Sequence, residues 1–536
     1  MSPFREARHH QDEIGVLAHE PTRPAAVTAT RKTCGTLPRS DNRYVATSVT
    51  GTTAVFCLLA LVVEDLQTWA LIPVAVCAMI LIPDAIRVLV GAMAPLDVRA
   101  VLAFGGIISF VVVPVLHLAW NVWPVRYKAS EPVDFEVATF YVASATAAGL
   151  LVMKLVANLV SRGSNCPERS GGSVSRAYDI QPLKWLIGSS LTIHFVNLAI
   201  VGGPFGYVDV ADGSLDLAGM GPLLVIGEAA PVLIVAFLLL RYRRALLQTR
   251  TSALLAYGLV FAIFVFVFFG GLRGSRGTFL FTVLACAGMF SIWIRPINRY
   301  LVAVLAVVGF SFMLIYGQYK SLGVDAFAKW QEQGAAAVFE ETQRGPAQTV
   351  LGDLGRTAVQ AVIFHKWLNG EYQIAWGGTY IGDSAFLFAP RALFPDRVEG
   401  KTYWGTLALQ GLSDVNGGKR SSRVYGLAGQ AMLNFGLWGV PFAFAILGAL
   451  LGWLTKADRR LQVNDPARLL LPLNAVALLV FLTSDLDNAI WIWLKIASLP
   501  TLGILFFRRR VSDSGRGNLD SASRTRTRVN SRLRRN

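Results

Sequence analysis

The chain has 536 residues, of which 54% are hydrophobic and 16% are charged, and its mean hydropathy is +0.48. An average soluble domain carries about a quarter charged residues, so this composition excludes a water-soluble fold. A formal net charge of +16 would suit a nucleic-acid partner. The basic residues, however, gather in the two tails and in short segments between apolar runs, a pattern that orients a membrane protein and predicts no nucleic-acid binding.

Both ends of the chain are polar. Residues 1–43 are rich in Arg, Thr and His and have no apolar segment near Met1, so we expect a disordered cytoplasmic arm and not a cleavable signal peptide. Residues 511–536 are rich in Ser and Arg and predict a second disordered cytoplasmic tail, attracted to anionic lipid.

Apolar runs within residues 44–510 predict an all-α transmembrane domain of about 12 spans. A crossing helix needs about 20 residues, and several runs are shorter, so their ends are approximate. Pro73 and Pro83 bracket the second run and oppose a long helix there. The predicted spans are Ala46–Val63, Trp69–Ile82, Val101–Trp120, Val137–Val160, Trp185–Val201, Met220–Leu240, Ala253–Phe269, Thr278–Ile294, Leu301–Tyr316, Ala428–Leu454, Leu469–Leu482 and Ile490–Phe507.

Basic residues alternate between the two sides of these spans. With the N-terminal arm inside, the basic connections fall on the cytoplasmic side, as the positive-inside rule requires, and the opposite connections are neutral or acidic. We therefore expect a multi-pass protein of the cytoplasmic membrane with both termini in the cytoplasm. The basic connections are residues 162–184, 241–244, 295–299, 456–460 and 508–510.

One connection is much longer than the others. Residues 317–425, between the ninth and tenth spans, fall on the outer side and contain enough Trp, Tyr and Phe to fold. Within them, apolar residues of Thr349–Leu368 recur at near-helical spacing, which predicts an amphipathic helix lying on the bilayer. Loops of this length are normally functional or disordered, so we expect function here.

The first cluster that could carry chemistry is Gly270–Gly277, which holds Arg273 and Arg276 between two spans. These arginines fall on the outer side, where the positive-inside rule gives them no role in topology. Glycines permit close approach of the backbone to a ligand, and two guanidinium groups suit a diphosphate. The alternative is a tight turn whose arginines only reach lipid head groups.

The second cluster lies in the long outer connection. It runs from Gly378 through Asp383 to Arg391, Arg397 and Lys401. Prolines on both sides of Arg391 restrict the backbone and would hold its guanidinium in place. A surface turn would look similar, but a place in an ordered loop favours a binding role.

The third cluster joins Arg423 to the stretch Tyr425–Gly439. Its small residues permit tight helix packing. The amides of Gln430 and Asn434 would be unfavourable against lipid, so we expect Arg423, Tyr425 and Asn434 to contact substrate.

Two further residues are candidates on their own. Glu228 lies inside a span, where an acid is a functional hypothesis by default; Lys495 in the last span could be its partner, in a structural pair or in a site. His365, in the long outer connection, is the histidine that could act as a catalyst. The chain has no CxxC pair and no HExxH, Walker A or GxSxG pattern, so no metal, P-loop or hydrolase site is predicted.

The three clusters, in this order, resemble the O-antigen polymerase (Wzy-type) and oligosaccharide repeat-unit polymerase families. The shared elements are Gly-Ser-Arg-Gly at Gly274–Gly277, Pro-Arg-x-Leu-x-Pro at Pro390–Pro395 and Asn-Phe-Gly-x-x-Gly at Asn434–Gly439. The resemblance covers residues 253–454 at the level of motifs. Family members often have Lys-Pro after the second element, whereas this chain has Asp396-Arg397-Val398, which keeps a charge and loses the proline.

The resemblance implies an all-helical glycosyltransferase that polymerises undecaprenyl-diphosphate-linked oligosaccharide units without a cofactor. Arg273, Arg276 and Arg391 would hold the diphosphate leaving group. The displacement also needs a base, for which Asp383, Glu371 and His365 stay open. Its partners would be the lipid-linked oligosaccharide, membrane lipid, a flippase and a chain-length regulator.

Three other functions stay open. A ligase of the same superfamily would need the same leaving-group site. A flippase or transporter of the lipid-linked glycan would normally show internal repeats, which are not found, and interior charges, of which Glu228 and Lys495 are examples. A receptor or scaffold would not need arginines in an external glycine turn.

Overall fold

The computed structural model describes residues 46–47, 49–54, 56, 68–125, 127–162, 181–203, 221–270, 276–322, 325–342, 345–385, 394, 398–418 and 423–506. Every regular element within these residues is helical. Among them, 11 helices are long and apolar enough to cross a membrane. The prediction of an all-α bundle of membrane-spanning helices is therefore confirmed.

The membrane-length helices follow one another along the chain as far as α13, after which helices shorter than α13 form most of the described part of residues 325–435. The main helices are α2 (Thr68–Leu89), α3 (Val98–Ile107), α4 (Val113–Trp120), α5 (Phe135–Arg162), α6 (Gln181–Ile200), α8 (Gly221–Glu228), α9 (Ala230–Arg241), α10 (Arg243–Gln248), α11 (Thr251–Phe269), α12 (Arg276–Trp293), α13 (Arg299–Leu322), α14 (Asp325–Thr342), α15 (Pro346–Thr349), α16 (Thr357–Leu368), α17 (Gly378–Ser384), α18 (Lys401–Gln410), α19 (Leu412–Asn416), α20 (Gly426–Phe435), α21 (Gly439–Arg460), α22 (Leu470–Thr483), α23 (Leu486–Trp493) and α24 (Leu499–Phe506). Short π or 3-10 turns join several of them: η1 (Ile108–Val112), η2 (Val350–Leu354), η3 (Gly436–Trp438), η4 (Pro466–Leu469) and η5 (Leu494–Ser498).

The predicted spans agree with these helices in number and place wherever both can be compared. Half of Ala46–Val63, the first predicted span, lies outside the described residues, and the predicted N-terminal arm and C-terminal tail lie wholly outside them. Every other predicted span coincides with one of the 11 membrane-length helices. The second is longer than expected, because α2 continues through both Pro73 and Pro83.

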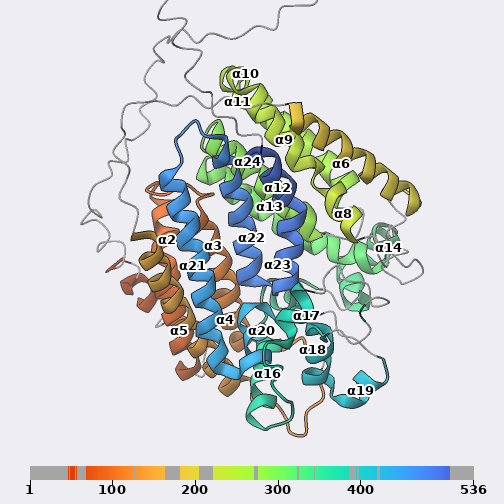
Figure 1. Cartoon of the computed structure of the whole chain (residues 1–536). Helices are drawn as coiled ribbons and strands as arrows, with labels where there is room; N and C mark the ends of the chain where they lie inside the picture. Colours follow the sequence, from red (N-terminus) through yellow and green to blue (C-terminus); the bar gives the residue numbers. More distant parts are fainter. Residues whose placement is uncertain are drawn as a thin grey trace, which may run out of the picture. The chain divides into compact units, whose positions relative to one another are not determined.

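Helices α5 and α21 are in close contact along their length and lie side by side in Figure 1. Glycines make this contact possible. A Cβ atom added at Gly448 would lie 2.5 Å from the backbone oxygen of Met153, and one added at Gly452 would lie 2.7 Å from that of Ala157. Small residues let two helix backbones approach in a membrane, where packing replaces the hydrophobic effect as the driving force.

Helices α16 to α20 gather at one end of the bundle, beyond the ends of α22 and α23 (Figure 1), and we call this end the loop end. The prediction of an amphipathic helix lying on the bilayer is wrong. Thr349–Leu368 is divided at Gly355, and in its second half, α16, nine of the 12 residues are buried. The apolar spacing was compatible with one buried face, but α5, α18 and α20 cover the other faces as well.

Candidate active site at the loop end

Three carboxylates surround one lysine at the loop end. Lys401, the first residue of α18, places its Nζ 2.8 Å from Asp485 Oδ2 and 2.7 Å from Asp487 Oδ1. Its backbone N–H donates to Asp383 Oδ1 at 3.0 Å. Burial disfavours the charge of Lys401, but Asp485 and Asp487 outweigh burial and raise its pKa, so the ammonium is charged at neutral pH.

Asp485 joins this cluster to α20. It precedes α23, and its Oδ1 accepts the backbone N–H groups of Tyr425 and Gly426, each at 2.8 Å. These donors lie at the first turn of α20, where a helix leaves its N–H groups without partners of their own. A carboxylate at that position is stabilised by hydrogen bonds and by the helix dipole, so α23 and α20 hold each other in place.

Asp383 has a pKa near neutral pH. Burial raises its pKa to about 7, and the hydrogen bond from the Lys401 backbone only partly offsets this. Its Oδ2 accepts a hydrogen bond from Gln430 Nε2 at 3.0 Å, and Gln430 Oε1 in turn accepts the Leu486 N–H at 2.8 Å. A carboxylate held this way and titrating near 7 is suited to accept a proton from a substrate hydroxyl.

The amides predicted to contact substrate are used within the protein. Asn434 Nδ2 donates to Thr379 Oγ1 at 2.6 Å, and the Thr379 N–H donates back to Asn434 Oδ1 at 3.2 Å. Both residues are fully buried. Asn434 thus ties α20 to α17 and helps to hold Asp383, four residues after Thr379.

Arginines gather next to the acids. Arg276 Nη2 lies 2.7 Å from Asp353 Oδ1. Burial lowers the pKa of Arg356, and its charge interacts with those of Asp485, Asp353, Arg276 and Arg423. Within the described part of the chain, the buried Arg276 Nη1 and Arg356 Nε have no hydrogen-bond partner. Guanidinium groups with spare donors can bind an anion.

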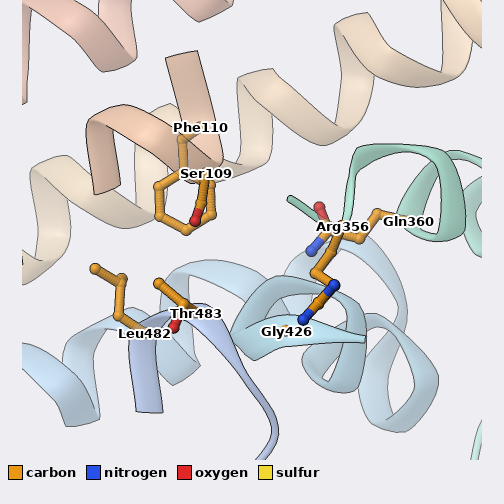
Figure 2. A pocket seen from close by; sticks show the side chains of 7 residues that line it. All are labelled: Ser109, Phe110, Arg356, Gln360, Gly426, Leu482 and Thr483. Atoms are coloured by element: carbon orange, nitrogen blue, oxygen red, sulfur yellow. The ribbon is translucent and has the colours of Figure 1, made fainter. Parts of the chain in front are cut away.

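A cavity of about 10 Å³, room for about one water molecule, lies beside Arg356. Figure 2 shows its lining, with Arg356 reaching toward Gly426. Arg356 and the acid–lysine cluster approach each other here, because Gly426 also lines the cavity and its N–H donates to Asp485. A glycan cannot enter a cavity of this size and would bind beside it. The lining residues are Ser109, Phe110, Arg356, Gln360, Gly426, Leu482 and Thr483.

The other predicted bases lie apart from this cluster. Glu371 accepts a hydrogen bond from Ser130 Oγ at 2.6 Å and lies 3.8 Å from Lys366 Nζ. Burial raises its pKa, but the bonds from Ser130 and the charge of Lys366 lower it overall, which makes Glu371 a poor base. His365 is part-exposed on α16, where its Nε2 lies 3.1 Å from Asn369 Nδ2.

The remaining predicted residues have different surroundings. Tyr425 is fully buried, and Arg423 is half-buried near Arg356. Glu228 is not at the loop end but pairs with Lys495 at 2.7 Å, between α8 and η5. The predictions for Arg273, Arg391 and Arg397 fall on positions outside the described residues.

The sequence pattern missed several residues of this site. Arg356 and Gln360 stand inside an apolar stretch, and Asp485 and Asp487 count in the sequence only as acids of a short outer connection. One signal was available for Asp485, because an Asp just before an apolar helix is typical of an N-terminal cap. Nothing in the local pattern marks Arg356.

Replacing Gly405 by alanine should destabilise the loop end. A Cβ atom there would lie 1.8 Å from Tyr425 Oη and 2.2 Å from Tyr425 Cζ, and this tyrosine is fully buried. Overpacking of this kind costs about 1–3 kcal/mol, so the melting temperature in detergent should fall. Gly258→Ala is the matched control, because its added Cβ would meet nothing within 4 Å. Equal melting temperatures for the two variants would contradict this packing.

No family model matches the chain, and no curated protein or solved structure matches it either. The site therefore stands on its own geometry.

Proposed function

We propose that the chain is a glycosyltransferase that polymerises undecaprenyl-diphosphate-linked oligosaccharide units on the outer face of the cytoplasmic membrane. The observation that carries the proposal is that Asp485 links Asp383, a proton acceptor, to Arg356, a group that can bind an anion. Asp485 contacts Lys401, whose backbone N–H donates to Asp383. The charge of Asp485 also acts on Arg356. Glycosyl transfer from a diphosphate needs both parts in one place.

The reaction divides between the two parts. The acceptor hydroxyl oxygen bonds to the anomeric carbon of the donor sugar, while the bond from that carbon to the diphosphate oxygen breaks. Asp383 takes the hydroxyl proton, and the electron pair leaves with the diphosphate. Arg276 and Arg356 stabilise the charge that develops there, together with Arg273 and Arg391 from the same pattern of clusters.

The arrangement of charges supports the outer placement of this site. The basic helix α10 and the loop end lie at opposite ends of the bundle (Figure 1). The positive-inside rule assigns α10 to the cytoplasm, and so assigns the loop end to the outer face. The lipid tail of a polyprenyl donor would remain in the bilayer while its diphosphate reaches the arginines.

A transporter of the same lipid-linked glycan is the second candidate. The observation in its favour is the buried pair of Glu228 and Lys495, because ionisable groups inside membrane helices often mark a transport path. A ligase that transfers a finished glycan would use the same site as the polymerase. Product analysis separates the three functions.

The test uses purified protein in nanodiscs with synthetic undecaprenyl-diphosphate oligosaccharide, with chain length scored on a gel. We expect a ladder of products from the wild type and at least a roughly 100-fold loss of elongation for Arg276→Ala, Arg356→Ala, Arg273→Ala and Arg391→Ala, comparable to removing a transition-state donor. Arg460→Ala, an exposed arginine at the end of α21, is the matched control and should elongate like the wild type.

Other outcomes point elsewhere. Transfer of a single glycan to a foreign acceptor, without a ladder, would indicate a ligase. Movement of labelled lipid between leaflets, with no elongation of several glycans, would contradict the polymerase and support a transporter.

A further inference from the structure

An ion pair lies inside the membrane-length helices, away from the loop end. Lys495 Nζ and Glu228 Oε2 are 2.7 Å apart, and their side chains are 7% and 1% exposed. Both residues stand near the middle of membrane-length helices, Gly221–Arg241 and Leu486–Leu505. Charges at such positions are costly and persist where they have a partner and a role.

The lysine of this pair is connected to the loop end through its own helix. Its ammonium lies 4.9 Å from the centre of the Trp491 ring, one turn earlier. Asp487 stands a further turn earlier, so the three residues follow one face of the helix. Asp487 in turn holds Lys401 at 2.7 Å. Helix α23 thus connects Glu228 to the candidate active site, through contacts at Lys495 and Asp487 and through the helical spacing of Asp487 and Trp491 between them.

The glutamate of this pair is held by its neighbours. It ends α8, and the two preceding carbonyl groups, of Ile226 and Gly227, both accept from Ser190 Oγ on α6. A Cβ atom added at Gly227 would lie 3.1 Å from the Cα of His194, so α6 and α8 are in backbone contact. The backbone of Glu228 is therefore held in place, and its carboxylate can position the last span through Lys495.

The lysine, by contrast, stands where its helix is irregular. It belongs to the π turn η5, which inserts an extra residue per turn between α23 and α24. Such a turn permits α23 to rotate or shift along its axis, and π turns are frequent at functional sites. A contact at Lys495 can therefore favour one rotation and one axial position of α23.

We propose that Glu228 and Lys495 are positioning residues for the loop-end site. The pair fixes the rotation and height of α23, and thereby sets Asp485 and Asp487 around Lys401. The inference rests on the proposed function only for its activity readout, because the position of α23 can be measured without any substrate.

The first measurement is hydrogen–deuterium exchange of residues 485–493 in the purified protein. Glu228→Gln and Lys495→Met each leave an unpaired charge, and we expect roughly tenfold faster exchange at the start of α23 in both. The neutral double variant leaves no unpaired charge, so it should fold and show exchange between the wild type and the single variants. The charge-swapped variant Glu228→Lys/Lys495→Glu should restore slow exchange.

The second measurement is the pH profile of elongation. Asp487 and Lys401 both act on the ionisation of Asp383, so displacement of α23 should shift the acid limb of the profile as well as lower the rate. Asp84→Asn is the matched control, since the buried Asp84 forms an ion pair with the part-exposed Lys154 between α2 and α5. It should lower the melting temperature without changing exchange at residues 485–493 or the position of the acid limb.

The outcomes separate the two proposals. Exchange at residues 485–493 that stays at the wild-type level in the single variants, or in the neutral double variant if the single variants do not fold, would overturn the positioning role. Faster exchange in a protein that elongates no glycan would support the positioning role and contradict the polymerase.

Discussion

Asp383→Asn should abolish elongation while leaving the protein folded. Asparagine has nearly the same shape and keeps an oxygen for the Lys401 N–H, but it cannot accept the hydroxyl proton. Its NH2 group would face Gln430 Nε2, so the hydrogen bond from Gln430 is lost. Loss of a general base typically costs a factor of about 10²–10⁴. We expect a loss in that range in the gel assay, with a melting temperature lowered only by the loss of the one hydrogen bond from Gln430, worth about 1–3 kcal/mol.

The pH dependence gives the same proposal a second check. A base works in its ionised form, so elongation by the wild type should rise with pH through the pKa of Asp383, about 7, and then level off. The effect on stability has the opposite sign. Because the folded-state pKa is raised above the unfolded value, the contribution of the protonated form to stability is complete at low pH and is lost as the pH rises through about 7.

Glu371→Gln and His365→Gln are the controls for this assignment. Both residues stood as candidate bases beside Asp383, but each contacts neighbours outside the acid–lysine cluster. Their variants should retain elongation within about tenfold, the range of indirect effects on geometry. A complete loss in His365→Gln, together with an active Asp383→Asn, would transfer the role of base to the histidine.

Asp485→Asn should be among the most destabilising single substitutions at the loop end. Asp485 is fully buried, accepts two N–H groups at the start of α20 and pairs with a nearly buried Lys401. Its amide replacement turns an NH2 group toward the lysine and removes part of the charge that balances it. Breaking a buried pair costs about 3–5 kcal/mol, measurable as a lower melting temperature in detergent.

The double variant Asp485→Asn/Lys401→Met distinguishes loss of a charge balance from loss of packing. It should recover part of the stability, because no buried ammonium is left short of a partner. Asp458→Asn is the matched control, since Asp458 pairs with Arg468 at 2.8 Å in a part-exposed position. It should change stability by less than about 1 kcal/mol. Equal effects at Asp485 and Asp458 would contradict the buried role of Asp485.

Local pattern was enough to predict the membrane-length helices. Their apolar runs are set by the thickness of a bilayer, a constraint that acts on each segment separately. The same kind of pattern failed for α16. Apolar residues at helical spacing indicate that one face of a helix is buried. They do not predict that neighbours such as α18 and α20 cover the remaining faces.

The helical class, 11 of the predicted spans and part of the candidate site could be predicted before the structure was known. Asp383, Lys401 and Arg276 stood out because charge in an ordered outer segment is locally unusual. Only the tertiary structure joined them to Asp485, Asp487 and Arg356. These contacts connect segments far apart in the chain, such as the pair of Lys401 and Asp485. A buried charge is stabilised by a partner that the fold brings near it, and residues next to it in sequence do not reveal that partner.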